Sequence, residues 1–241
     1  LGHPFLCCVS FVHTPVNMKL VVLAAFAAAA VASSPLPVSW RPGFQPSDDG
    51  NAPKVKVNFY SESLCPYCQA FEIGELASVM ASDLADIIVL HQVVYGNAEG
   101  TGKHVQCQHG PQECLGNTME DCAIHLYPNQ SQWFPFVHCV EKYVPNVVEH
   151  LQECAAATGL NATAIDECRN GPLGIELVNQ AANETNALEP PHQYVPWVVV
   201  DGEQLVDTGK LGKRICAAYK GPTPASCSSL PHVDDDSTSD E

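Results

Sequence analysis

Residues 55–68 read VKVNFYSESLCPYC, in which a strand pattern runs directly into two cysteines separated by two residues. Residues 55–60 alternate apolar and polar side chains, which is the period of a half-buried strand. After a turn over residues 61–64 and the cysteine pair, apolar residues recur at helical spacing to about Ser82. Residues 87–95 are rich in β-branched side chains and predict a second strand. The expected order is therefore strand, CxxC, helix, strand.

The two cysteines, Cys65 and Cys68, have the spacing of a redox-active dithiol. Cys65 lies at the strand-to-helix turn, where free backbone N–H groups and the helix dipole favour negative charge. A thiolate is stabilised there, and the thiolate is the nucleophile of disulfide exchange. The second thiol lies within reach of a mixed disulfide on the first. We predict Cys65 as the nucleophile, Cys68 as the resolving residue, and Pro66 and Tyr67 as substrate contacts.

Two simpler interpretations of the CxxC are a structural disulfide and half of a zinc site. A zinc site usually needs a second Cys/His pair at compact spacing, and the sequence has no partner CxxC. The position between a strand and a helix favours redox chemistry, so we predict no metal. For Tyr67, the alternative to a substrate contact is an exposed aromatic side chain without a role.

Beyond the second strand, the pattern changes to helices and then returns to strands. Residues from about 112 to 187 read as mostly helical. Residues 194–202 form an apolar strand ending in Asp-Gly, which is a hairpin signal, and the returning strand is expected at Leu205 and Val206. Residues 211–219 are expected to form a closing helix. The predicted fold class is α/β: a thioredoxin-like fold with a cysteine-rich helical insertion between the second strand and the proline-led strand.

That late strand is preceded by Val195-Pro196. Proline cannot donate to a sheet ladder, so it usually lies at a strand start or a bulge. In thioredoxin-like proteins a cis-proline at this place faces the CxxC and leaves a backbone edge free for substrate. We therefore predict Val195 and Pro196 as substrate-binding residues.

The N-terminal region has the layout of a secretory signal. Residues 18–32 combine a basic start, an apolar run from Leu20 and small residues that suit a signal peptidase. The alternative is a membrane anchor, but thirteen apolar residues span only about 20 Å as a helix, short of the roughly 30 Å hydrocarbon core. Residues 1–17 resemble upstream, non-native sequence, and the proline-rich residues 33–53 resemble a flexible lead-in.

The folded domain is expected over residues 54–227, followed by a disordered acidic tail over residues 228–241 that has little apolar surface to bury. The formal net charge is −16. Such an acidic balance argues against nucleic acid as a partner, because phosphate binding needs a basic surface. We predict no membrane span in the mature chain.

Twelve cysteines occur, and two of them precede the signal. Apart from the CxxC, an even set remains, which behind a signal peptide reads as a framework of structural disulfides. These cysteines are Cys107, Cys114, Cys122, Cys139, Cys154, Cys168, Cys216 and Cys227. Eight cysteines admit 105 pairings, of which only Cys216 with Cys227 is predicted here, across a Gly-Pro turn. Sequons at Asn129, Asn161 and Asn183 predict glycosylation on the secretory route.

Residues 107–122 read CQHGPQECLGNTMEDC. Three cysteines with a histidine between them could suggest a metal site, but structural disulfides are favoured in an oxidising compartment. The run contains every fixed position of C-Q-H-G-x-x-E-C-x-x-N-x-x-x-x-C and resembles the signature of the gamma-interferon-inducible lysosomal thiol reductase family. The CxxC and Tyr194-Val195-Pro196-Trp197 also match that family. The resemblance covers roughly residues 55–227, but it gives no catalytic role to His109.

The resemblance implies an enzyme that reduces protein disulfides in acidic endosomes and lysosomes, or after secretion. It would assist degradation, antigen processing or innate defence. Its partners would be disulfide-bonded, unfolded proteins, and it would use no cofactor beyond a small thiol such as cysteine or glutathione as reductant. At about pH 5 an ordinary cysteine, with a pKa of about 8.5, is a thiolate in about one molecule in three thousand, so Cys65 needs a strongly lowered pKa.

Other functions are open at this point. A secreted disulfide isomerase or oxidase would share every motif and differ only in redox poise. A redox-inert, cysteine-stapled binding module would keep Cys65 and Cys68 permanently joined. A zinc-binding module would retain stoichiometric metal through purification.

Overall fold

The computed structural model describes residues 52–229, so the expectations for residues 1–51 and 230–241 lie outside the described residues. A four-stranded sheet has the order β2-β1-β3-β4. Strand β1 (Val55–Ser61) pairs in parallel with β2 (Ile88–Val94) and antiparallel with β3 (Trp197–Val200), which pairs with β4 (Glu203–Gln204). The predicted strand–CxxC–helix–strand unit is confirmed, with β1 at the centre of the sheet.

The helices fall into three groups along the chain. The CxxC is followed by α1 (Pro66–Phe71), a π-helical turn (Glu72–Leu76), α2 (Ala77–Met80) and a 3-10 turn (Asp83–Ile87). The insertion contains α3 (Pro111–Leu126), α4 (Gln130–Glu141), α5 (Leu151–Thr158), α6 (Ala162–Asn170) and α7 (Pro172–Asn186), with 3-10 turns at Gly102–His104 and Val147–His150. The C-terminal group is a 3-10 turn (Thr208–Lys210), α8 (Leu211–Ala218) and α9 (Ala225–Ser229).

Side-chain alternation explains why β1 occupies the centre. Val55, Val57 and Phe59 are buried, whereas Lys56 is exposed, so one face of the strand enters the core. The ring of Phe59 packs edge-to-face on Phe71 of α1, with ring centroids 5.0 Å apart. This contact fixes the first helix on the strand that precedes it, and so fixes the turn that carries the CxxC.

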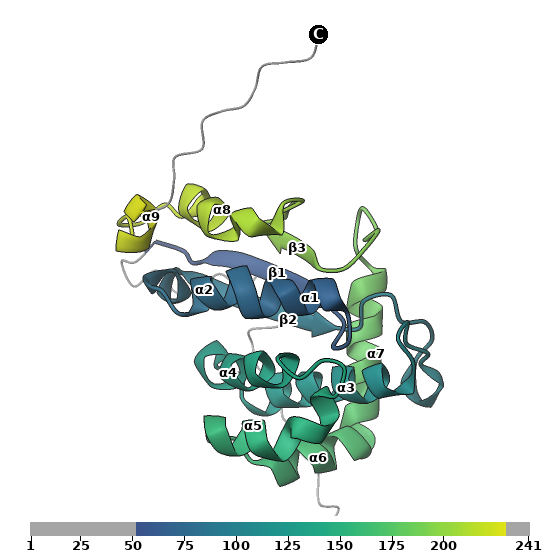
Figure 1. Ribbon diagram of the computed structural model, residues 1–241. Helices are drawn as coiled ribbons and strands as arrows, with labels where there is room; N and C mark the ends of the chain where they lie inside the picture. The colour runs from purple at the N-terminus through teal and green to yellow at the C-terminus, as the bar shows by residue number, and fades with distance from the viewer. Residues whose placement is uncertain (1–51, 230–241) are drawn as a thin grey trace, which may run out of the picture. The chain divides into compact units, whose positions relative to one another are not determined.

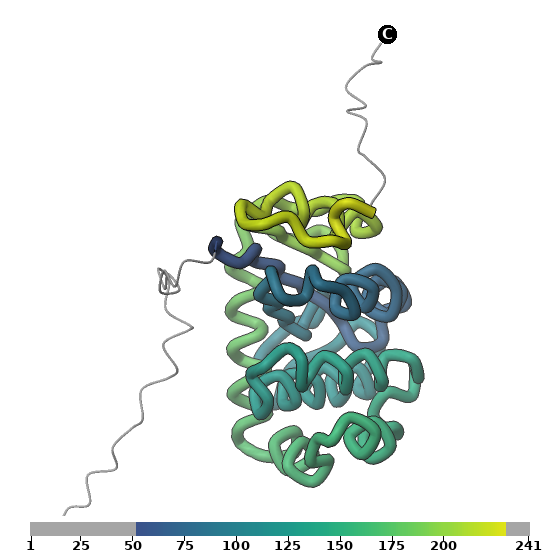
Figure 2. The backbone as a smooth tube through the Cα atoms, turned by 90° about the vertical axis from the view of Figure 1, so that its left-hand side faces the viewer, coloured from purple at the N-terminus to yellow at the C-terminus, as the bar shows by residue number. Residues whose placement is uncertain are grey.

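The insertion places α3 to α6 beyond β2 and α7 alongside the strands, whereas α8 and α9 lie at the opposite side, beyond β3 (Figure 1 and Figure 2). Its core consists of fully buried apolar side chains from successive helices, among them Met119, Phe136 and Ile165. Helices α3 and α7 also contact β2. The insertion therefore shares one hydrophobic core with the sheet, and the predicted thioredoxin-like fold with a helical insertion is confirmed.

Disulfides link segments within the insertion and, separately, the two helices of the C-terminal group. The pairs are Cys107–Cys114, Cys122–Cys168, Cys139–Cys154 and Cys216–Cys227. Cys122–Cys168 connects α3 to α6, and Cys139–Cys154 connects α4 to α5. The pairing expected for Cys216 with Cys227 is present, between α8 and α9.

The returning strand of the hairpin was expected at Leu205 and Val206, and this placement is wrong. Asp201 and Gly202 both have positive φ, at 50° and 88°, which suits a tight two-residue turn. The turn places Glu203 directly opposite Val200, so pairing begins two residues earlier than expected. Leu205 still donates its N–H to the carbonyl of Val198 at 2.8 Å, but β4 ends at Gln204.

Within residues 52–229, no helix combines the length and apolarity that crossing a bilayer requires.

The disulfide that closes the longest loop is expected to contribute most to stability. Cys122 and Cys168 are 46 residues apart, and chain-entropy arguments give about 4 kcal/mol for such a loop. Replacing both by alanine should lower the free energy of unfolding in urea by about this amount. The matched control is Cys216→Ala with Cys227→Ala, which opens an 11-residue separation and should cost about 3 kcal/mol. If the Cys122–Cys168 double variant loses no more free energy of unfolding than the control, the larger contribution expected for the longer loop would be contradicted.

Candidate active site

Cys65 is the N-cap residue of α1, directly after the turn that follows β1. Its φ of −76° and ψ of 118° are extended, and Pro66 begins the helix without needing an N–H partner. Both cysteines of the CxxC are free thiols; Cys65 is 5% exposed and Cys68 is fully buried. Cys65 is therefore the member of the pair that an external disulfide meets first.

The two thiols have opposite electrostatic environments. The thiol of Cys68 donates a hydrogen bond to Cys65, the backbone N–H groups of Cys68 and Tyr67 add to it, and His109 contributes positive charge. Together these groups outweigh burial and lower the pKa of Cys65 to about 6. Burial raises the pKa of Cys68 well above its usual value. This division matches a nucleophile and a resolving thiol.

The predicted substrate-binding residues lie together beside Cys65. The Val195–Pro196 peptide bond is cis, and Cys65 Sγ lies 3.9 Å from the carbonyl oxygen of Val195. An open groove of about 540 Å³ adjoins them, lined by apolar and aromatic side chains that include Tyr67, Tyr194 and Val206. Tyr67 is 75% exposed. The groove reaches Cys65 through Val195, which lines the groove and whose carbonyl lies beside the Cys65 sulfur.

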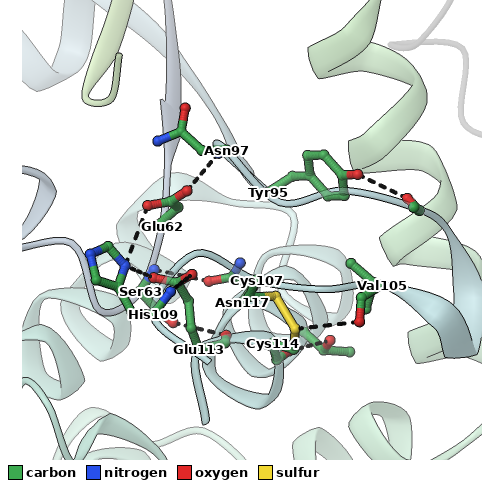
Figure 3. The surroundings of a disulfide bond; sticks show 12 residues. Glu62, Ser63, Tyr95, Asn97, Val105, Cys107, His109, Glu113, Cys114 and Asn117 are labelled. Atoms are coloured by element: carbon green, nitrogen blue, oxygen red, sulfur yellow. Dashed lines mark hydrogen bonds and ion pairs between the residues drawn. A yellow bond between two sulfur atoms is a disulfide. The ribbon is translucent and has the colours of Figure 1, made fainter. Parts of the chain in front are cut away.

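The signature segment is packed against the turn that precedes Cys65 (Figure 3). The Ser63 N–H donates to Asn117 Oδ1 at 2.9 Å, and Ser63 Oγ donates to the carbonyl oxygen of Glu113 at 3.2 Å. Gly116 makes this approach possible, because a Cβ there would lie 2.3 Å from Ser63 Oγ. Helix α3 therefore carries the hydrogen-bond partners of Ser63 in the buried turn, and the Cys107–Cys114 disulfide fixes the loop that leads into α3.

Three ionisable side chains meet at this contact: Glu62, His109 and Glu113 (Figure 3). The Nδ1 atom of His109 hydrogen-bonds Glu113 and lies 3.6 Å from Glu62 Oε2. Glu62 is 1% exposed and accepts the Asn97 N–H on Oε1 at 2.5 Å. Burial, with the nearby charge of Glu113, raises the pKa of Glu62 to about 7. Sequence reasoning missed Glu62; its position three residues before the expected thiolate was the available signal.

A second acidic group lies in the core. One carboxylate oxygen from each of Glu72, Glu120 and Glu141 lies within 4.8 Å of the others, and all three side chains are buried. Gln92 donates to Glu72 Oε1 at 3.1 Å. Burial raises the pKa of Glu72 to about 8 and those of Glu120 and Glu141 well above the usual value. These groups are neutral acids over the acidic range.

Both acidic groups contain ligand types that metal ions use. Metal binding requires deprotonated ligands, and the burial that raises the pKa of Glu62 and of the three core carboxyls favours bound protons instead. The absence of a metal remains a prediction.

Comparison with known proteins agrees with this geometry. Residues 56–158 match the family model described as gamma interferon inducible lysosomal thiol reductase. A gamma-interferon-responsive lysosomal thiol protein of Arabidopsis thaliana is 40% identical over 187 residues, covering 75% of this chain and 78% of the relative. A gamma-interferon-inducible lysosomal thiol reductase of Carassius auratus is 36% identical, covering 73% of each chain.

This chain belongs to the gamma-interferon-inducible lysosomal thiol reductase family. It is a thiol-disulfide oxidoreductase, as predicted. Two solved structures share its fold: the reduced disulfide bond oxidoreductase DsbG of Mycobacterium tuberculosis, with 22% identity, a TM-score of 0.55 and coverage of 77% of this chain and 88% of that one, and oxidised BdbD of Bacillus subtilis, with 14% identity, a TM-score of 0.51 and coverage of 71% and 96%. At such low identity these likenesses establish the thioredoxin-like fold alone.

The sequon asparagines of this family member are all exposed. Asn129 and Asn161 are N-cap residues whose side chains accept backbone N–H groups of α4 and α6, and Asn183 lies within α7. Glycosylation at these positions stays a prediction.

The core carboxyls give stability a defined pH dependence. The pKa of Glu72 is about 8 in the folded state and about 4.5 in the unfolded state, so protonation of Glu72 favours folding. This stabilisation is fully present below pH 4.5 and is lost as the pH rises towards 8. Glu72 alone should make the free energy of unfolding about 3 kcal/mol smaller at pH 8 than at pH 5. Urea titrations at both pH values test this. Glu72→Gln should remove that part of the difference, whereas the exposed control Glu167→Gln should keep it. Equal pH dependence in wild type and Glu72→Gln would contradict the account.

Proposed function

We propose that this protein reduces disulfide bonds of other proteins in an acidic compartment through Cys65 and Cys68. The observation that carries the proposal is the position of Cys65: an N-cap thiol with a pKa of about 6, facing the cis Val195–Pro196 bond. At pH 5 a thiol with that pKa is a thiolate in about one molecule in ten. An ordinary cysteine would be two to three orders of magnitude less ionised.

The chemistry follows dithiol exchange. The Cys65 thiolate attacks one sulfur of a substrate disulfide, and the other substrate sulfur leaves as a thiolate that takes up a proton. Cys68 then loses its proton and attacks Cys65, which releases the second substrate thiol and leaves a Cys65–Cys68 disulfide. Two electrons have passed from the dithiol to the substrate. Two molecules of a small thiol such as cysteine or glutathione restore the pair and become a disulfide.

The groove supports unfolded protein as the substrate class. Tyr67, Tyr194 and Val206 present apolar surface next to Cys65, which suits side chains that a folded protein would hide. The Val195 carbonyl, 3.9 Å from the Cys65 sulfur, supports an extended substrate chain that binds beside the cis Val195–Pro196 bond.

Acidic residence is supported by the buried carboxyls. Burial favours the protonated forms of Glu72, Glu120 and Glu141, so the contribution of these three groups to stability is greatest in acid. Together with the sequence signal for secretion and the sequons, this supports delivery to endosomes and lysosomes, with secretion of part of the protein. There the enzyme would assist degradation, antigen processing or innate defence.

The direct test is reduction of insulin or denatured immunoglobulin at pH 5 and pH 7 with a small thiol as reductant. Wild type should be active at pH 5. Cys65→Ser should lose activity at least about a thousandfold, because the attacking thiolate is gone. Cys68→Ser should accumulate a mixed disulfide between Cys65 and substrate, detectable by mass spectrometry.

Three results would overturn this function. Activity retained in Cys65→Ser would exclude Cys65 as the nucleophile. Inactivity of all three proteins, with a Cys65–Cys68 disulfide that dithiothreitol cannot reduce, would indicate a redox-inert binding module. Net formation or rearrangement of substrate disulfides without net reduction would indicate an oxidase or isomerase.

A further inference from the structure

We propose that His109, held as a cation by buried Glu113, is a positioning residue that keeps Cys65 ionised in acid, and that neighbouring Glu62 stays neutral over the same range. This inference rests on the proposed role of Cys65. It gives an electrostatic function to the histidine of the signature, which the exchange chemistry leaves without a role.

His109 lies in the loop before α3 and is held there through both its backbone and its side chain. Its backbone N–H donates to Glu113 Oε1 at 3.0 Å, and its Nδ1 atom bonds Glu113 Oε2 (Figure 3). Glu113 is fully buried, so its carboxylate has no better counterion among the described residues than this imidazole. The Cys107–Cys114 disulfide closes the loop around the pair. The imidazole is therefore held at one place beside the turn that carries Cys65.

Protonation of His109 is favoured despite partial burial. Burial lowers the pKa of His109, but the hydrogen bond and charge of Glu113 outweigh it, with smaller contributions from Glu62 and Cys65, and the net pKa is raised. The positive charge of His109 in turn lowers the pKa of Cys65. A cation at His109 and a thiolate at Cys65 therefore stabilise one another.

Glu62 is built to be neutral in acid. Its Oε2 faces His109, its Oε1 accepts the Asn97 N–H, and Gly96 leaves room for its side chain, because a Cβ there would lie 2.3 Å from Glu62 Cγ. Its pKa of about 7 means that it carries a proton at pH 5. An ionised Glu62 would repel the Cys65 thiolate. Each negative charge makes ionisation of the other group less favourable.

The other titratable groups around Cys65 do not reverse this balance. Cys68 of α1 supplies a hydrogen bond, and Glu141 of α4, whose charge would oppose Cys65, is kept neutral by burial. On the β3 side the neighbour is the uncharged carbonyl of Val195. His192 contacts the backbone of Gly96, which adjoins Glu62, and burial lowers the pKa of His192. The net local charge therefore favours the thiolate most in acid, where His109 is charged and Glu62 is not.

The test is the pH titration of Cys65 in the reduced full chain, without substrate. Thiolate is followed by absorbance at 240 nm and by the rate of iodoacetamide alkylation, with Cys65 identified by mass spectrometry. In His109→Gln the thiolate fraction at pH 5 should fall, by at most about tenfold, because the positive charge of His109 lowers the pKa of Cys65. In Glu62→Gln the thiolate fraction at pH 5 should stay within about twofold of wild type. The titration curve of Cys65 should span a narrower pH range, because the coupled ionisation of Glu62 near pH 7 is gone.

Two further variants make the result decisive. Glu113→Gln keeps an acceptor for the His109 N–H but removes the carboxylate, and should reduce the thiolate at pH 5 in the same direction as His109→Gln. This variant also serves if His109→Gln does not fold. His150→Gln is the matched control, because His150 pairs with Glu153 on the surface of the insertion and should change nothing.

The proposal is overturned if His109→Gln and Glu113→Gln titrate like wild type, or if Glu62→Gln loses as much thiolate at pH 5 as they do. The second result would mean that the three side chains only hold the loop in place. Because the titration needs no substrate, it can succeed or fail independently of the reductase assay.

Discussion

The attachment of the helical insertion to the turn before Cys65 is the constraint on which the rest of the site depends. Residues 61–64 are buried, although two of them are serines and one is a glutamate. A buried polar turn is tolerated only when its donors and acceptors are satisfied. Helix α3 supplies the partners of Ser63 through Asn117 and the carbonyl of Glu113, whereas Gln92 donates to Ser61 and the Asn97 N–H donates to Glu62. A thiol at the end of such a turn has a fixed position relative to the sheet.

This attachment joins structure to chemistry through a single short motif. Asn117 and Glu113 hydrogen-bond Ser63 of the turn, and His109 lies between Glu113 and Glu62 of the turn. The Cys107–Cys114 disulfide closes the loop that carries His109. Asn117 satisfies a backbone group, Glu113 holds His109, and His109 adds charge beside the thiol. The insertion is thus part of the candidate active site rather than an appendage to a thioredoxin-like core. Acidic conditions favour protonation of the core carboxyls, and they also favour a charged His109 and a neutral Glu62 near Cys65.

Local patterns allowed the central unit to be predicted from sequence. Alternation over residues 55–60, the CxxC and the β-branched run that follows encode strand, helix and strand within one short segment, so neighbouring residues decide the result. The helical insertion was equally predictable from its periodicity. The returning hairpin strand was misplaced because its register depends on the positive φ angles of Asp201 and Gly202 rather than on apolar residues at Leu205 and Val206.

Contacts between residues far apart in sequence could not be predicted from local patterns. Cys122 and Cys168 are far apart in sequence and meet only because α3 packs on α6. Glu72, Glu120 and Glu141 read as ordinary surface acids of helices, yet three elements converge to bury them together. Glu62 and His109 lie on separate segments, and only the packing of α3 on the turn brings them within 3.6 Å.

The measurement that tests the attachment most directly is the alkylation rate of Cys65 at pH 5 in Gly116→Ala. The added methyl group would meet Ser63 Oγ and Val147, so α3 and the turn must separate. Gly74→Ala is the matched control, because a Cβ at Gly74 meets nothing within 4 Å. We predict alkylation slower by about tenfold or more in Gly116→Ala, since small displacements of a reacting group carry large rate costs, and an unchanged rate in Gly74→Ala. A Gly116→Ala protein that folds and reacts like wild type would contradict the account.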